Sequence, residues 1–232
     1  MLGTLLAALR SGDALDQAFK EFDEMLSAGQ WMFGTARGVL EGRVPPSECR
    51  EELYTRDQDI NELLRSLRLN LVTHLSVNRN ADIPACLALM SIAKDAERIG
   101  DYCKNLFEVT EHGILAKGEG KYQERIASLP GDVEEIFGLV RNAFSESSSK
   151  QAKVAIKAAD AVRATCDQIG QELLDDHAEI STQDAVALSL QTRYSKRIAS
   201  HLANIATAVF GKIEELDFRK PPKPVQPDTA TE

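Results

Sequence analysis

Apolar residues recur at alternating steps of three and four along most of the chain, which is the spacing of one face of an α-helix. The clearest case is the segment 91–111, which reads SIAKDAERIGDYCKNLFEVTE. Its apolar stripe consists of Leu89, Ile92, Ala96, Ile99, Cys103 and Leu106. A second stripe is formed by Leu53, Ile60, Leu64, Leu67 and Leu71. No segment shows a convincing strand pattern, so the sequence predicts an all-α fold.

Glycines, prolines and capping residues divide the chain into six long helices. The helices are expected at about 13–41, 47–78, 82–117, 132–149, 150–178 and 181–216, with a short leading helix at 1–10. Ser47, Asp82 and Ser181 are the predicted N-caps of three of them, and Asp184 completes a capping box with Ser181. Pro130 and Gly131 are expected to interrupt the chain before the fourth helix.

Three helices followed by three more indicate an internal repeat. When Ile99 is placed over Ile198, the preceding arginines coincide, and Asn105 falls on Asn204. We therefore predict a tandem of two antiparallel three-helix bundles, the first at 1–117 and the second at 118–218. The end of the chain, 219–232, is rich in proline and poor in apolar residues, so we expect it to be disordered.

Composition and charge narrow the classes of function. The net charge of −9 argues against a general nucleic-acid binder. No apolar run is long enough to span a membrane, and the start of the chain lacks the features of a signal peptide. The cysteines at 49, 86, 103 and 166 are too scattered for a zinc knuckle or a redox pair. Reduced thiols in a cytoplasmic protein are the expected state.

The best candidate site is a pair of carboxylates. Glu97 and Asp101 lie one helical turn apart, away from the apolar stripe, and their oxygens suit hard cations such as Mg²⁺, Mn²⁺, Ca²⁺ or iron. The alternative is a solvated helix face on which Lys94, Arg98 and Lys104 pair with these acids. The sequence has no phosphate loop or nucleophile elbow, and no histidine has a glutamate three residues before it. We therefore expect that the protein is not an enzyme.

The run 97–101, which reads ERIGD and is followed by Lys104 and Asn105, resembles the third-helix signature of the PhoU family of phosphate-uptake regulators. The resemblance implies the tandem bundle. It also implies a role in coupling a phosphate ABC transporter ATPase to a two-component sensor kinase. Separately, we expect a homodimer because the helices are long and amphipathic. The resemblance favours iron or zinc at an acid cluster completed from the second helix, where the matching positions are Asp57 and Asn61.

The second bundle departs from that family pattern. Lys196 and Ser200 stand where its acid pair should be, and Cys166 and Gly170 stand on its second helix. Lys196 and Ser200 cannot make an anionic metal site, because neither carries a carboxylate. If a metal ion (Fe, Zn, Mg or Mn) binds, the site is expected in the first bundle, at Glu97, Asp101, Asp57 and Asn61. Two alternatives stay open: a metal-storage or metal-dependent hydrolytic bundle, and a metal-free structural adaptor.

Overall fold

The computed structural model describes residues 14–111, 122–175 and 181–218 of the 232-residue chain. These residues form six long helices and a 3₁₀ turn, and they contain no strand. In chain order the elements are α2 (Ala14–Leu40), α3 (Pro46–Val77), α4 (Ile83–Glu111), α5 (Gln123–Ser145), α6 (Ser149–Asp175), α7 (Thr182–Ala208) and η1 (Ile213–Glu215). The predicted all-α class and the six helices are confirmed.

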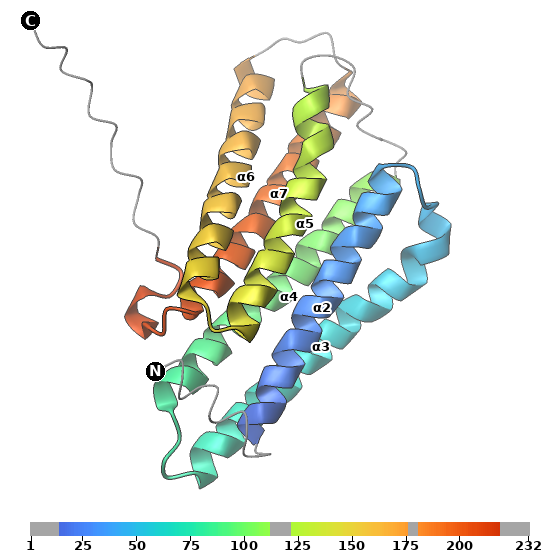
Figure 1. Cartoon of the computed structure of the whole chain (residues 1–232). Coiled ribbons are helices and arrows are strands. Elements are labelled where there is room, and N and C mark those ends of the chain that lie inside the picture. The colour runs from blue at the N-terminus through green and yellow to red at the C-terminus, as the bar shows by residue number, and fades with distance from the viewer. Residues whose placement is uncertain (1–13, 112–121, 176–180, 219–232) are drawn as a thin grey trace, which may run out of the picture.

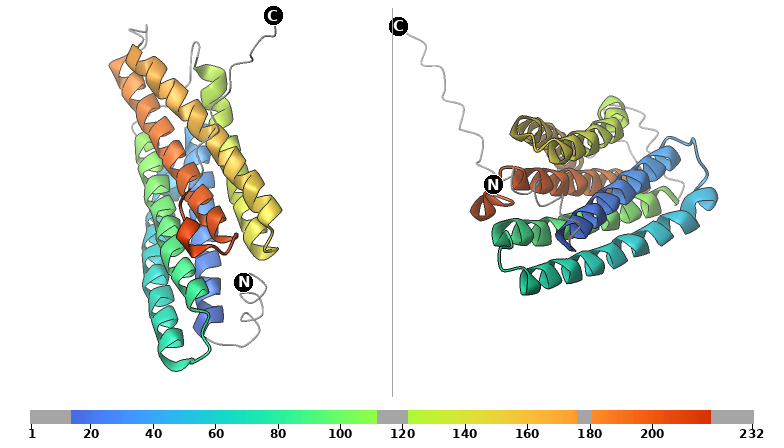
Figure 2. Two further views of the ribbon diagram at one scale, coloured as in Figure 1. Left: turned by 90° about the vertical axis from the view of Figure 1, so that its left-hand side faces the viewer. Right: turned by 60° about the horizontal axis from the view of Figure 1, so that its bottom comes forward.

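The helices form two groups of three that pack side by side (Figures 1 and 2). Helices α2, α3 and α4 all contact one another, and so do α5, α6 and α7. The two groups meet mainly through α4 and α7, and less extensively through α2 and α5. Helix α4 is therefore a central element, in contact with α2, α3 and α7.

One continuous apolar core runs through both groups. Aromatic pairs join α2 to α5: the rings of Phe22 and Phe144 are 5.4 Å apart, and those of Phe33 and Phe137 are 5.8 Å apart. The α6–α7 side of the core is built mainly from small residues, among them Ala152, Ala155, Ala159, Ala199, Ala203 and Ala206. All six are fully buried, and small side chains of this kind allow helices to approach closely.

Three sequence-based boundaries are wrong. Helix α3 begins at Pro46 rather than after a Ser47 cap, because proline suits the first helical position, where its missing N–H is no loss. Helix α5 runs through Pro130 without a break. Helix α7 ends at Ala208, before Gly211 takes a left-handed φ of 66°. The Pro130 site shows that burial of Ile126, Leu129 and Val133 outweighs the lost backbone bond.

Two predicted caps are confirmed. The Asp82 carboxylate accepts a hydrogen bond from the Ala85 N–H at 3.1 Å. The Ser181 hydroxyl accepts one from the Asp184 N–H, also at 3.1 Å. The leading helix at 1–10, the end of the third helix near 117 and the tail at 219–232 lie outside the described residues.

Candidate functional site

The predicted site lies where α3 and α4 run antiparallel at close range. Gly100 allows that approach, because a Cβ atom there would lie only 2.9 Å from Cδ1 of Ile60 on α3. On the α2 side, a Cβ at Gly29 would lie 3.2 Å from Cγ2 of Ile99. Ile99 and Gly100 of the ERIGD run thus pack α4 against α2 and α3. Glu97 and Asp101, on either side of them, lie at the edge of the contact between α4 and α3.

The four predicted site residues fall at this junction, but their environments differ. Asp57 and Glu97 are each only 9% exposed, whereas Asp101 is half-buried. The amide of Asn61 donates to the backbone carbonyl of Asp57, one turn earlier on its own helix, at 2.9 Å. This hydrogen bond of Asn61 stays within α3.

A lysine lies among the acids. Nζ of Lys104 is 2.6 Å from Oδ2 of Asp57 and 3.7 Å from Oδ1 of Asp101, so it links α3 to α4. Glu97 pairs separately with Lys94, whose Nζ lies 2.6 Å from its Oε2. Each predicted acid thus has an ammonium partner from α4. Sequence reasoning recognised Lys94 and Lys104 as neighbours of the acids, but it missed that Lys104 crosses to the other helix.

The pKa values follow from this arrangement. Burial, together with the nearby charge of Glu97, raises the pKa of Asp101 above its ordinary value, although Lys104 opposes the shift. Burial by itself would lower the pKa of Lys104, but its hydrogen bond to Asp57 and the charges of Asp57 and Asp101 raise it. Lys104 is therefore firmly cationic, and its ammonium is the positive charge of the site.

The described residues show no ready-made metal site. Within the described part of the chain, no three His, Cys, Asp or Glu side chains are grouped closely enough to hold one. Hard cations need several carboxylate or carbonyl oxygens around one point. Here the space between Asp57 and Asp101 is taken by the Lys104 ammonium, which neutralises the same oxygens.

The equivalent positions of the second group also use a lysine. Lys196 on α7 pairs with Asp167 on α6, and the Ser200 hydroxyl donates to the Lys196 carbonyl at 2.7 Å. A lysine–aspartate bridge between the second and third helices is thus common to both groups. The sequence alone revealed the missing acids at Lys196 and Ser200, but not this replacement.

A polar cluster that sequence reasoning missed lies between α4 and α7. Asp95, only 8% exposed, accepts a hydrogen bond from the Asn204 amide at 3.0 Å and lies 2.7 Å from Nδ1 of His201. The Tyr102 ring stacks on His201 at 5.6 Å. The coincidence of Asn105 with Asn204 in the repeat was the only hint of it. These contacts hold the two groups together at their main junction.

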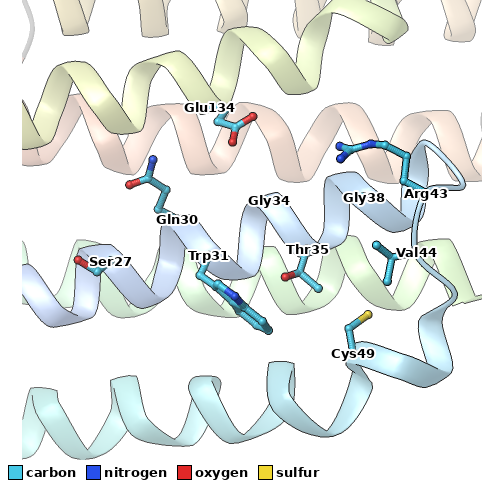
Figure 3. A pocket seen from close by; sticks show the side chains of 10 residues that line it. All are labelled: Ser27, Gln30, Trp31, Gly34, Thr35, Gly38, Arg43, Val44, Cys49 and Glu134. Atoms are coloured by element: carbon cyan, nitrogen blue, oxygen red, sulfur yellow. The ribbon is translucent and has the colours of Figure 1, made fainter.

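Two grooves flank Trp31 on α2. One, of about 570 Å³, opens between α2, the turn after it and α5, and Figure 3 shows Trp31, Val44 and Cys49 on one side with Glu134 opposite. Gly34 and Gly38 line the α2 side of this groove and place no side chain in it. The other, of about 690 Å³, lies between α2 and α3. The Arg56 guanidinium lies 4.2 Å from the Trp31 ring centre. Neither groove holds a nucleophile with an activating base.

Comparison with known proteins identifies a domain in the first half of the chain. The PhoU domain model matches residues 22–110, which span most of α2, all of α3, and α4 with its ERIGD run. This part of the chain is therefore similar to the PhoU domain.

Solved PhoU structures share the fold well beyond the matched domain. PhoU from Pseudomonas aeruginosa superposes with a TM-score of 0.75 at 18% identity, over 85% of this chain and 95% of that one. The phosphate transport system regulatory protein PhoU from Streptococcus pneumoniae gives 0.69 at 17% identity, over 86% and 96%. A search of curated proteins finds no match. None of the helices among the described residues is long and apolar enough to cross a membrane.

Proposed function

We propose that this chain is a cytoplasmic regulator of phosphate uptake. It would couple the ATPase of a phosphate ABC transporter to a two-component sensor kinase and restrain uptake when phosphate is plentiful. The observation that carries the proposal is the PhoU domain match over residues 22–110. The shared fold of a solved phosphate transport regulator adds support.

The regulator would act by docking, as a homodimer. The described residues offer long helix faces and open grooves, whereas they lack a catalytic constellation. Protein partners commonly use such helix faces and grooves. Pull-downs from host lysate should therefore recover a phosphate-transport ATPase, a sensor kinase or both, and recovery of neither would refute the docking role.

Asp101, the half-buried member of the carboxylate patch that it forms with the buried Asp57 and Glu97, would be part of this docking surface. Metal binding at these residues and Asn61 stays a prediction. The lysine partners favour the alternative of a metal-free adaptor, since Lys104 already supplies a cation to Asp57 and Asp101. Under this proposal, chelators leave both the fold and the regulatory activity unchanged.

The test is a phosphate-responsive reporter in the native host. Deletion of the gene should switch the reporter on in excess phosphate, and the wild-type chain should restore repression. A variant with Glu97→Ala and Asp101→Ala measures the role of the patch. Lys153→Ala with Asp160→Ala, two exposed changes on α6, serves as the control. A reporter that stays silent on deletion, in a host without a second copy of the gene, would refute the phosphate role.

A further inference from the structure

Exposed apolar side chains gather on the hairpin formed by the second half of α3 and the first half of α4. Ten large apolar side chains are exposed among the described residues, and five of them lie here. They are Leu69, Val72, Val77, Ile83 and Leu87, with exposed fractions from 48% to 73%. We call these five and the exposed arginines Arg65, Arg68 and Arg79 the hairpin face.

The charge of this hairpin is opposite to that of the whole chain. Residues 63–94 contain three arginines, Lys94, which pairs with Glu97, and a single acidic residue, Asp82, which caps α4. The chain as a whole carries −9. The positive charge is therefore local, and the rest of the molecule is more acidic than its overall charge suggests.

Spacing and shape place these residues on an accessible surface. Arg65, Leu69 and Val72 are separated by four and three residues, so they share one exposed face of α3. Ile83 and Leu87 share a face of α4 in the same way. The turn between the helices forms one end of the molecule, and Val77 and Ile83 flank it (Figures 1 and 2). The hairpin face thus combines an apolar tip with basic flanks.

We propose that the hairpin face docks on an anionic lipid bilayer. Val77 and Ile83 would enter the headgroup region, while the arginines would lie against lipid phosphates. The remainder of the chain, being acidic, is repelled by the same surface, so the molecule approaches with the hairpin face toward the bilayer. A helical protein partner would favour a groove, and the two grooves described above lie on α2 instead. The inference goes beyond the proposed function and does not depend on it.

Co-sedimentation of the full chain with lipid vesicles tests the proposal. Wild type should bind vesicles of phosphatidylcholine mixed with phosphatidylglycerol, but not vesicles of phosphatidylcholine alone, and salt should weaken the binding. Each Lys or Arg near an anionic surface is worth about fivefold in affinity, so Arg65→Gln with Arg68→Gln should weaken binding about 25-fold. Removal of Lys153 and Lys157 by the same change on α6 is the matched control, with an effect of at most about twofold because distant charges are screened.

The apolar part of the face has its own pair of variants. Val77→Ser with Ile83→Ser should lower vesicle binding about tenfold, since less apolar surface is buried. Val154→Ser with Val186→Ser changes two similarly exposed residues elsewhere and should leave binding unchanged. All these positions are exposed, and circular dichroism melting verifies that each variant is folded. Any variant that unfolds is replaced by its single substitutions.

Several results would overturn the proposal. The first is equal binding to neutral vesicles, or no binding to anionic ones. The second is a hairpin variant that behaves as its control does. If Val77→Ser with Ile83→Ser instead halves the molar mass in light scattering, the face is covered by a second copy of the chain. If the face binds an acidic helical peptide or DNA but no vesicle, its partner is another macromolecule.

Discussion

Lys104→Met tests whether a lysine ammonium holds α3 and α4 together at the carboxylate patch. The side chains of Lys104 and Asp57 are 23% and 12% exposed, so their pair lies between the exposed and the fully buried cases. Exposed pairs contribute about 0–1 kcal/mol, whereas breaking a buried pair costs about 3–5 kcal/mol. We therefore expect a loss of about 2 kcal/mol, which lowers the melting temperature by about 4–8 °C in a chain of this size.

The assay is thermal unfolding followed by circular dichroism, with two companion variants. Lys212→Met removes an ion pair whose side chains are 54% and 52% exposed, and it should change stability by less than about 1 kcal/mol. Asp57→Leu with Lys104→Met removes both partners and should recover most of the loss, because no buried charge is left unpaired. If Lys104→Met has the melting temperature of the wild type, or if the double variant is no more stable than Lys104→Met, the bridge does not hold α3 and α4 together.

The same variant separates a lysine site from a metal site. In the wild type the Lys104 ammonium neutralises Asp57 and Asp101, so Mn²⁺ and chelators should both leave the melting temperature unchanged. In Lys104→Met those carboxylates face each other without a cation. Added Mn²⁺ should then raise the melting temperature of the variant alone. If Mn²⁺ raises the melting temperature of the wild type as well, the patch binds metal in the presence of Lys104.

Three further predictions concern individual contacts. Gly100→Ala should lower the free energy of unfolding by about 1–3 kcal/mol, because the new Cβ atom clashes with Ile60. In an Ile60→Val background, which lacks Cδ1, the same substitution should cost at least about 1 kcal/mol less. Equal costs in the two backgrounds, measured by denaturant unfolding, would refute the clash. Asp101→Asn should melt higher than wild type at pH 7, because the raised pKa of Asp101 makes its ionisation costly in the folded state; the difference should vanish below the ordinary pKa of 3.8. Glu21→Leu should cost about 1–3 kcal/mol in urea unfolding, because this buried carboxylate accepts three side-chain donors; no loss would mean that water replaces it.

The fold was largely readable from the sequence because apolar spacing is a local and repeated signal. The stripe through Ile92, Ile99 and Cys103 specifies which face of α4 is buried, and all three are at most 1% exposed. The course of the chain at Pro130 was not readable. A proline is a strong local signal for a break, yet the burial of Leu129 and Val133 on one continuous face decides the outcome.

The site was readable only in part. The sequence predicted that Asp57 lies beside the run around Glu97 and Asp101, and the structure brings Asp57 and Asp101 together around Lys104. The sequence could not reveal which partner Lys104 selects, because a lysine within reach of Asp101 on its own helix also reaches Asp57 on the next. Likewise, the contact of Asp95 with His201 joins residues more than a hundred positions apart, and no local spacing encodes it.

The position of α4 among three neighbours has a consequence for mutational tolerance. Its sides are committed to α2 through Ile99, to α3 through Gly100 and Lys104, and to α7 through Asp95, which leaves one narrow exposed strip. On α6, by contrast, substitutions are felt by α5 and α7 alone. A systematic substitution library should therefore show α4, like α7 with its contacts to α4, α5 and α6, as less permissive than α6, with losses at successive positions reported by different neighbours.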